Sequence, residues 1–151
     1  MTGCVIRRCN PRDPGASALL RASHGLMDEM FPAETGHYLS VDGLAMPGIH
    51  FFLAERGGRA LGCVALAERR GYAEVRSMFV DPDAREMGLG DQLLDHVTEV
   101  ARSRGFPMLR LEAGDGLDAA LRLYQRHGFT PCGRFGEYPD SPHSIFMEKA
   151  L

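Results

Sequence analysis

The sequence has no long hydrophobic run and no strong excess of one charge. Its longest stretch without Asp, Glu, Lys or Arg covers residues 43–54 and is interrupted by Pro47, whereas a membrane-spanning helix needs about 20 apolar residues. No apolar segment follows the first charged residues, so we expect no signal peptide. The net charge is -3, and basic residues are not interleaved with aromatic ones. We therefore expect neither a membrane nor a nucleic acid as a partner.

Cysteine is scarce. The four cysteines, Cys4, Cys9, Cys63 and Cys132, form no Cys-x-x-Cys pair and have no histidine at metal-binding spacing. We expect reduced thiols in a cytoplasmic protein, and no bound metal. With 44% hydrophobic and 25% charged residues, the composition excludes a disordered, collagen-like or coiled-coil chain. The length of 151 residues, without repeats or linkers, predicts one domain over residues 1–151.

A first helix is predicted between Asp13 and Pro32. Asp13 suits the N-cap position and Pro14 suits the first turn, while Pro32 would end the helix. A second, short helix is expected within residues 34–45. Apolar residues at helical spacing form the expected buried face of the first helix: Leu19, Ala22, Leu26, Met27 and Met30.

Two later helices have clearer apolar stripes. One extends from Gly88 to Gly105, a glycine suited to a helix C-terminus, and the other ends at Gly128. The stripe of the first comprises Leu89, Leu93, Leu94, Val97, Val100 and Ala101. The stripe of the second comprises Leu117, Ala120, Leu121 and Tyr124.

Seven strands are predicted from alternating or continuous apolar segments. Gly57-Gly58 suits a tight turn between the second and third strands. Helices separate some strands and hairpins join others, so we expect an α/β fold with a mixed sheet. The expected strands cover residues 4–9, 50–55, 60–66, 73–80, 108–113, 130–135 and 144–149.

The clearest binding motif lies at residues 80–94. A strand ends, a loop follows, and Gly88-x-Gly90 begins a helix. Backbone N–H groups at a helix N-terminus bind phosphate, and glycine lets the phosphate approach closely. Arg85 could pair with a further phosphate oxygen, although the glycines could instead serve only the turn. A P-loop needs Lys after the second glycine, and a dinucleotide fingerprint needs a third glycine, so neither fits.

Two motifs together resemble the GNAT superfamily of acyl-CoA-dependent N-acetyltransferases. Residues 85–90, Arg-Glu-Met-Gly-Leu-Gly, resemble its pyrophosphate motif, and residues 123–129, Leu-Tyr-Gln-Arg-His-Gly-Phe, resemble its second motif. The resemblance extends over essentially the whole chain. It implies a central, mostly antiparallel sheet with a splay between strands four and five, flanked by about four helices. The C-terminal segment resembles one bacterial subgroup whose acceptor is not well defined.

The resemblance also implies acetyl-CoA as a co-substrate. Pantetheine would hydrogen-bond to the edge of the fourth strand at Met78, Phe79 and Val80, and one N–H there would polarise the thioester carbonyl. Arg85 would hold the pyrophosphate together with the backbone N–H groups of Glu86, Met87, Gly88, Leu89, Gly90 and Asp91.

Tyr124 matches the tyrosine that protonates the departing CoA thiolate in the superfamily. Without the resemblance, it is an aromatic residue on an apolar helix face and would belong to the core. Many members also have an asparagine where this chain has Leu117. That contact with CoA is therefore absent, or replaced by Asp115 or the backbone.

Acetyl transfer to an amine requires a neutral nucleophile. A Lys-like amine with a pKa of about 10.4 is neutral only about once in 2,500 molecules at pH 7, so a base is useful. Glu74 is the first candidate, because the superfamily often has a carboxylate on this strand, but burial would have to raise its pKa. Glu74 could equally be a solvated residue or form a salt bridge with Arg76. Glu112 is the second candidate.

The resemblance places the acceptor cleft beside the first two helices. Residues there could bind the acceptor or form a plain surface loop, and residues 138–143 could line the cleft or form a turn. The candidate substrate-binding residues are Glu34, His37, Tyr38 and Tyr138, with Asp140 and His143 nearby. Among the other histidines, His24, His96 and His127 are expected at the surface, and His50 in the core or at a strand edge.

We therefore expect an N-acetyltransferase that transfers acetyl from acetyl-CoA directly to a primary amine of a small molecule or peptide, in a ternary complex. No metal and no covalent acyl-enzyme is implied. One alternative is an acyl-CoA-binding regulator without turnover, and another is a partner-binding protein of the same fold. The resemblance is compatible with a homodimer, although the surface pattern identifies no interface.

Overall fold

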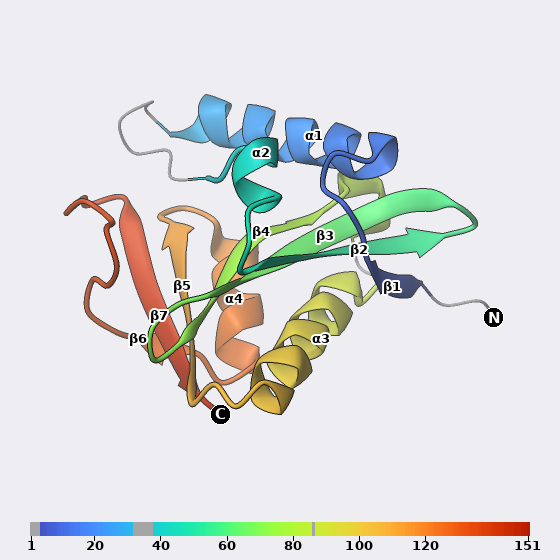
Figure 1. Cartoon of the computed structure of the whole chain (residues 1–151). Coiled ribbons are helices and arrows are strands. Elements are labelled where there is room, and N and C mark those ends of the chain that lie inside the picture. The colour runs from blue at the N-terminus through green and yellow to red at the C-terminus, as the bar shows by residue number, and fades with distance from the viewer. Residues whose placement is uncertain (1–3, 32–37, 86) are drawn as a thin grey trace.

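The computed structural model describes residues 4–31, 38–85 and 87–151, and their strands form one seven-stranded sheet. The strand order is β1-β2-β3-β4-β5-β7-β6, and only β4 and β5 are parallel neighbours. Figure 1 shows α1 and α2 on one face of the sheet and α3 and α4 on the other. The expected mixed sheet is confirmed. The elements are β1 (Val5–Arg8), α1 (Pro14–Met30), α2 (Val41–Leu44), β2 (Ile49–Arg56), β3 (Arg59–Glu68), β4 (Ala73–Val80), the 3-10 helix η2 (Pro82–Ala84), α3 (Leu89–Ser103), β5 (Met108–Gly114), α4 (Asp118–Arg126), β6 (Thr130–Pro131) and β7 (Ser144–Ala150).

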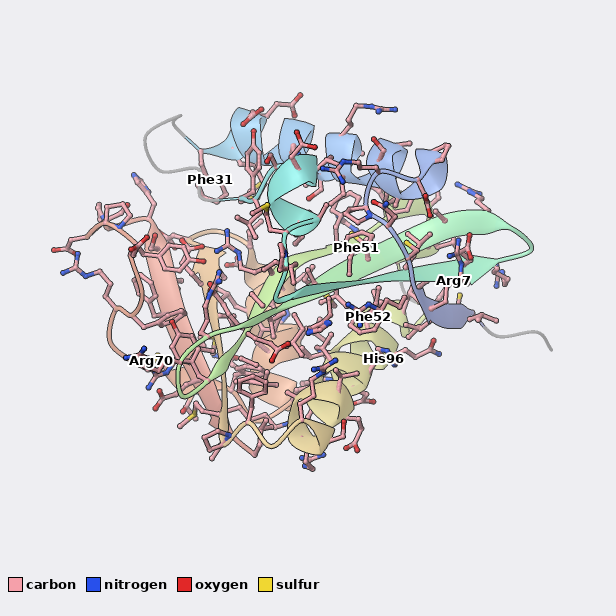
Figure 2. All side chains as sticks on the ribbon, in the orientation of Figure 1. Arg7, Phe31, Phe51, Phe52, Arg70 and His96 are labelled. Atoms are coloured by element: carbon pink, nitrogen blue, oxygen red, sulfur yellow. The ribbon has the colours of Figure 1, made fainter. Side chains whose placement is uncertain are left out.

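The sheet separates two hydrophobic cores, because successive strand side chains point to opposite faces. Phe51 of β2 belongs to the core under α1 and α2, whereas Phe52 belongs to the core under α3 and α4. Figure 2 shows the two rings on opposite sides of the sheet. The Phe52 ring meets His96 of α3 edge to face, with 4.5 Å between centroids. His96 therefore lies at the edge of a core and not, as expected, at the surface.

The stripe predicted for α3 is confirmed. Leu89, Leu93, Leu94 and Val97 are buried against the sheet. The helix begins after Gly88, which has a left-handed φ of 73°, and Gly105, also left-handed, follows its last turn. Within the described residues, none of the helices has the length and hydropathy of a membrane span.

The buried face predicted for α1 is partly wrong. Ala16, Leu19 and Leu20 are buried, whereas Ala22 is exposed and Met30 is 43% exposed. The physical reason is that α1 rests on the sheet through its N-terminal half. Asp13 occupies the N-cap position as predicted, but its side chain makes no capping hydrogen bond.

Two other elements are shorter than predicted. Within residues 34–45, the described helix α2 covers only Val41–Leu44, with Ser40 as its cap. β6 covers Thr130–Pro131 instead of residues 130–135. Pro131 has no N–H to continue the ladder, and after it Cys132 makes a single backbone hydrogen bond, to the carbonyl of Phe146.

The implied splay between β4 and β5 is confirmed. The two strands pair only at Ala73 with Leu109 and at Glu74 with Arg110. Beyond these pairs the strands separate, although β4 continues to Val80 and β5 to Gly114. The sheet therefore opens in its middle, and the backbone of β4 has a free edge.

A β-bulge interrupts β4 beside this opening. The register with β3 passes from Ala65 opposite Arg76 to Cys63 opposite Phe79, so β4 contains one extra residue. Ser77 adopts a φ of 53°, a value that side-chain-bearing residues rarely show. Such a bulge bends its strand and redirects the neighbouring side chains.

Candidate functional site

A groove of about 950 Å³ extends from the splay along the N-terminus of α3. Its walls are the end of β4, the loop and first turn of α3, the inner face of α4 and the last turns of α1. This volume lies in the range of small-molecule and cofactor sites. The predicted cofactor residues that line the groove are Met78, Phe79, Val80, Arg85, Gly88, Leu89, Gly90 and Asp91.

Two predicted cofactor residues remain, Met87 and Glu86. Met87 is half-buried and packs against the core under α3, so its side chain is not part of the groove wall. Glu86 lies outside the described residues.

The backbone of β4 offers N–H groups to the groove. The Asp81 N–H donates to the carbonyl of Leu61 on β3 at 2.8 Å. N–H groups alternate in direction along a strand, so those of Val80 and Met78 point to the opposite side, where β5 has separated. A ligand with its own amide groups can therefore pair with β4 in the way a neighbouring strand would.

The first turn of α3 forms a cradle for an anion. The helix N-terminus presents unpaired N–H groups with partial positive charge. Arg85, Arg122 and Arg126 also line the groove. The one acidic side chain of the turn, Asp91, is bound by His127 at 2.7 Å and by Arg126 at 3.2 Å. These hydrogen bonds, that of His127 above all, lower the pKa of Asp91 and offset its charge.

The two glycines of the motif serve different purposes. Gly88 is required for its left-handed backbone, and a Cβ there would meet no atom within 4 Å. Gly90 has ordinary helical backbone, but a Cβ would lie 3.1 Å from a methyl of Leu123 and 3.7 Å from Met78. Gly90 therefore makes room for the side chains of Leu123 and Met78, and the approach of a phosphate to the two glycines stays a prediction.

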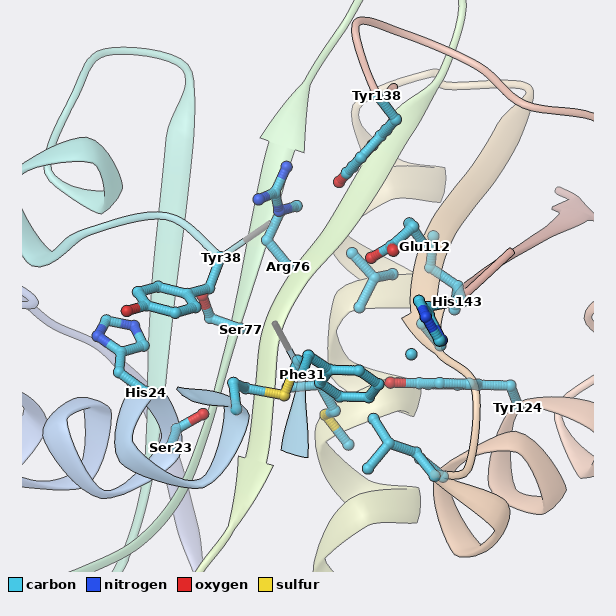
Figure 3. A pocket seen from close by; sticks show the side chains of 18 residues that line it. Ser23, His24, Phe31, Tyr38, Arg76, Ser77, Glu112, Tyr124, Tyr138 and His143 are labelled. Carbon is cyan, nitrogen blue, oxygen red and sulfur yellow. The ribbon is translucent and has the colours of Figure 1, made fainter. Parts of the chain in front are cut away.

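A second, smaller cavity of about 120 Å³ lies between α1, β4, β5 and the loop before β7. Figure 3 shows Arg76, Glu112 and Tyr138 around one end and His24, Tyr38 and Ser23 around the other. The groove and the cavity share six lining residues, so they adjoin. The shared residues are Ser23, Met27, Met78, Leu117, Ala120 and Tyr124.

Tyr124 lies where the groove meets the cavity. Its side chain is only 7% exposed, and its ring contacts Phe129 edge to face. Burial, with a smaller contribution from the charge of Glu112, raises the pKa of Tyr124 to about 12. The hydroxyl therefore keeps its proton across the physiological range, as a proton donor must.

Glu74 lies outside both cavities. Its buried carboxylate accepts hydrogen bonds from Arg69 at 3.1 Å, from Arg76 at 3.3 Å and from the hydroxyl of Tyr138. The alternative of a salt bridge between Glu74 and Arg76 is confirmed. The geometry does not favour the prediction of a catalytic base at this position.

Glu112, the second candidate base, lines the cavity and accepts a hydrogen bond from the Ser144 hydroxyl at 2.6 Å.

Of the predicted substrate-binding residues, Tyr38 and Tyr138 line the cavity, while Glu34 and His37 lie outside the described residues. His143 also lines it. Asp115 is exposed and lines neither cavity, and its replacement of the missing asparagine contact stays a prediction.

His24 is one of the cavity residues that the sequence did not reveal. It was expected at the surface, yet its ring lines the cavity and stacks on Tyr38 with centroids 4.1 Å apart. His127 was also expected at the surface. It lies between two carboxylates, those of Asp91 and Asp95, and only 13% of its side chain is exposed. His50 is buried against Glu68, in agreement with the core position predicted for it.

None of the four cysteines lines the groove or the cavity as described. Burial raises the pKa of the Cys63 thiol to about 12, which suppresses its thiolate. Within residues 4–31, 38–85 and 87–151, no group of three or more His, Cys, Asp or Glu side chains could hold a metal ion.

Comparison with known proteins matches this geometry to one family. The sequence profile of the Acetyltransferase (GNAT) family matches residues 18–129. An Azospirillum brasilense protein named IAA acetyltransferase is 37% identical over 153 aligned residues, which cover 100% of each chain.

Solved structures give the same result for the fold. A Klebsiella pneumoniae protein, named as a candidate acyl-CoA N-acyltransferase, superposes with a TM-score of 0.82 at 29% identity, over 98% of this chain and 97% of its own. An Elizabethkingia anophelis GNAT acetyltransferase with bound acetyl-CoA superposes with a TM-score of 0.72 at 20% identity, over 100% of each chain. The second likeness concerns the fold alone.

Proposed function

Since the chain belongs to the GNAT acetyltransferase family, we propose that it transfers the acetyl group of acetyl-CoA directly to the primary amine of a small acceptor. Acetyl-CoA would occupy the groove and the acceptor would occupy the cavity. The observation that carries this proposal is the junction of the two sites at Tyr124 and Met78. Residues 1–151 would act as one domain.

The groove suits acetyl-CoA in each of its parts. The exposed edge of β4 suits the amides of pantetheine, since Met78 and Val80 present N–H groups there. The N-terminus of α3 and Arg85 suit the pyrophosphate. Arg122 and Arg126 on α4 supply further positive charge for phosphate. A protein with a similar fold has been solved with acetyl-CoA bound.

Three groups of the chain would act on the reacting atoms. The Met78 N–H would donate to the thioester oxygen as negative charge develops on it. Tyr124 would donate its hydroxyl proton to the departing thiolate. Glu112 would attract the cationic amine to the cavity through its charge. Glu74 would hold Arg76 and Tyr138 in place at the rim.

Direct transfer is favoured over a covalent acyl-enzyme. A thiol intermediate needs a cysteine within reach of the thioester, and no cysteine lines either described site. The size of the cavity, about 120 Å³, favours a small amine head group, since an engineered cavity of about 150 Å³ in another protein holds benzene. The acceptor would therefore be a small molecule or the end of a larger one.

The proposal is tested by thermal unfolding with acetyl-CoA, CoA, NAD and ATP, followed by an amine screen that detects released thiol. IAA is tested separately from the amines, because it stands in the name of the relative that is 37% identical. A ligand at 100 times its Kd should stabilise by about 2.7 kcal/mol, which is several degrees for a chain of this size. We expect shifts with CoA compounds alone and amine-dependent thiol release. Binding without thiol release from any amine would indicate the non-catalytic regulator instead, and absence of binding would overturn the proposal.

A further inference from the structure

Two residues that line the cavity each carry a buried polar atom for which the described part of the chain supplies no hydrogen-bond partner. These atoms are Nε2 of His24 on α1 and Oγ of Ser77 in the bulge of β4. Buried polar atoms are nearly always paired, so two unpaired atoms in one small cavity indicate that a polar ligand group completes them. The third such atom, Nδ1 of His50, lies outside the cavity.

The His24 ring is held in a fixed orientation. It stacks on Tyr38 at an interplanar angle of 16°, and the Tyr38 hydroxyl donates to Asp28 at 3.0 Å on the same helix as His24. The other ring nitrogen hydrogen-bonds to the backbone of Leu39, an interaction that favours a proton on that nitrogen. Nε2 of the neutral ring therefore carries a lone pair, which accepts hydrogen bonds.

Ser77 is fixed by the backbone and not by its side chain. Its φ of 53° belongs to the bulge, and its carbonyl accepts a hydrogen bond from the Cys63 thiol at 3.3 Å. Residues with a Cβ rarely adopt this region, because the Cβ lies too close to the following carbonyl oxygen. The strained position carries a hydroxyl into the cavity wall next to Met78, whose N–H faces the proposed thioester site.

We propose that His24 is the base that takes the proton from the acceptor amine, and that Ser77 Oγ positions the same amine for attack. An ammonium group has three N–H donors, and His24 and Ser77 each offer it an acceptor. This inference rests on the proposed function, because it assigns residues to the acceptor of that reaction. It names the class of ligand group as a primary amine that enters as its ammonium form.

The protons and bonds balance as follows. The ammonium gives one proton to Nε2 of His24, and the neutral nitrogen then forms a bond to the acetyl carbon. The carbon–sulfur bond breaks, and the thiolate takes a proton from Tyr124. The nitrogen, now bearing two protons, returns one to Tyr124 and keeps one as the amide. His24 releases its proton to solvent, so the products are the amide, CoA thiol and one proton.

The charged groups around His24 are compatible with this role. Burial lowers the pKa of His24, while Asp28 and the Leu39 backbone oppose the shift. Tyr38 covers one face of the ring, and Arg76 and Glu112 line the cavity beyond it. A neutral ring at pH 7 can accept a proton, which a permanently charged one could not.

The test uses ethylamine as a minimal acceptor and follows kcat/KM between pH 7 and 9 by thiol release. If His24 removes the proton, kcat/KM is constant over this range, since the ammonium form itself is bound. His24→Gln must instead capture the neutral amine from solution, so its kcat/KM rises about 100-fold over the two pH units. At pH 7 we expect a loss of about 10²–10⁴-fold in the variant. A constant profile in His24→Gln would overturn the proposal.

Two variants separate this role from a structural one. His96→Gln removes another histidine whose pKa burial lowers, but His96 packs on Phe52 away from the cavity, so its profile should match that of the unaltered protein. Ser77→Ala should raise KM for ethylamine several-fold with the profile still constant. A rising profile in Ser77→Ala would contradict the division of roles.

A binding measurement decides the proposal even if ethylamine is not acetylated. The ¹⁵N resonance of His24 Nε2 is followed with CoA bound while ethylamine is added. We expect a shift with ethylamine and none with tetramethylammonium, which has no N–H to donate. Absence of a shift with ethylamine would overturn this inference, whereas CoA binding without thiol release would count against the proposed function alone.

Discussion

At the scale of single residues, the surroundings of a side chain decide its chemistry. Tyr124 continues the apolar stripe of α4, and in most helices such a residue would only fill the core. Here the same burial raises its pKa to about 12 and places its hydroxyl where groove and cavity meet. Burial and the proposed catalytic role of Tyr124 therefore depend on the same position.

Replacing Tyr124 by phenylalanine tests the proton donor. Removal of the hydroxyl should lower kcat by about 10²–10⁴-fold, because general acid catalysis contributes that much. The Kd for CoA should change little, since the ring stays in place. Steady-state kinetics and calorimetry measure the two quantities. Tyr72→Phe is the control, because Tyr72 packs on Phe135 and lines neither site. An unchanged kcat in Tyr124→Phe would exclude the role.

A second prediction concerns the thiols. Because burial raises the pKa of Cys63 to about 12, this residue should not react with iodoacetamide in the folded protein. The half-buried Cys4, Cys9 and Cys132 should react first, and acetyl transfer should survive their alkylation if no acyl-cysteine forms. Mass spectrometry of digests identifies the labelled sites. Loss of activity that parallels labelling of one cysteine would favour a covalent intermediate.

Sequence reasoning found some site residues and missed others for identifiable reasons. Tyr124 and the edge of β4 follow from motifs that are continuous in sequence. His24 meets Tyr38 only because the chain returns along α1, and no local pattern encodes that contact. Ser77 was not predicted, because a left-handed position in a bulge is usually occupied by glycine and this one is not. Glu74 was linked to Arg76, but its contacts with Arg69 and Tyr138 arise from tertiary packing.

At the scale of elements, periodic patterns predicted the helices and strands well, and their ends less well. α3 and β4 match their predicted bounds because their apolar patterns are long and are bounded by glycine or proline. The buried face of α1 was harder to predict, because some of its apolar residues pack on the sheet and others line the groove. No local sequence pattern indicates the splay between β4 and β5, which was predicted only from the family resemblance.

Glycine substitutions distinguish backbone requirements from space requirements. Gly88→Ala should lower the stability by about 1 kcal/mol, because left-handed backbone disfavours a Cβ. Gly25→Ala should raise it by a similar amount, since Gly25 is an exposed residue within α1 and a Cβ there meets nothing within 4 Å. Each change corresponds to roughly 3 °C in Tm, measured by calorimetry. Equal shifts of the same sign in both variants would contradict this account.

At the scale of the whole molecule, paired carboxylates make stability depend on pH. The pKa values of Glu55, Glu68 and Asp91 are lowered by their partners Arg7, His50 and His127. A carboxyl with a lowered pKa in the folded state stabilises the protein above its unfolded pKa of about 4. That contribution is lost as the pH falls through the folded value.

Asp91→Asn tests this dependence for the link between α3 and α4. The variant should have a lower Tm than the unaltered protein at pH 6, and the difference should shrink as the pH falls below about 4 and through the lowered pKa of Asp91. The effect should be modest, because 44% of the Asp91 side chain is exposed and water screens it. Asp140→Asn, in an exposed loop, serves as the control. A difference in Tm that stays the same as the pH falls from 6 through the acid range would refute the electrostatic origin.

The splay in the sheet has a consequence for how such a protein can change over generations. The groove relies largely on main-chain N–H groups, which almost any substitution leaves in place. The cavity relies on side chains, from His24 and Tyr38 to Arg76 and Glu112, which single mutations can replace. If the cavity binds the acceptor and the groove binds acetyl-CoA, as proposed, the acceptor can be exchanged while the acetyl donor is retained. Evolution toward new acceptor substrates should begin with substitutions in the cavity wall. No variant along the way would need to lose the binding of the acetyl donor.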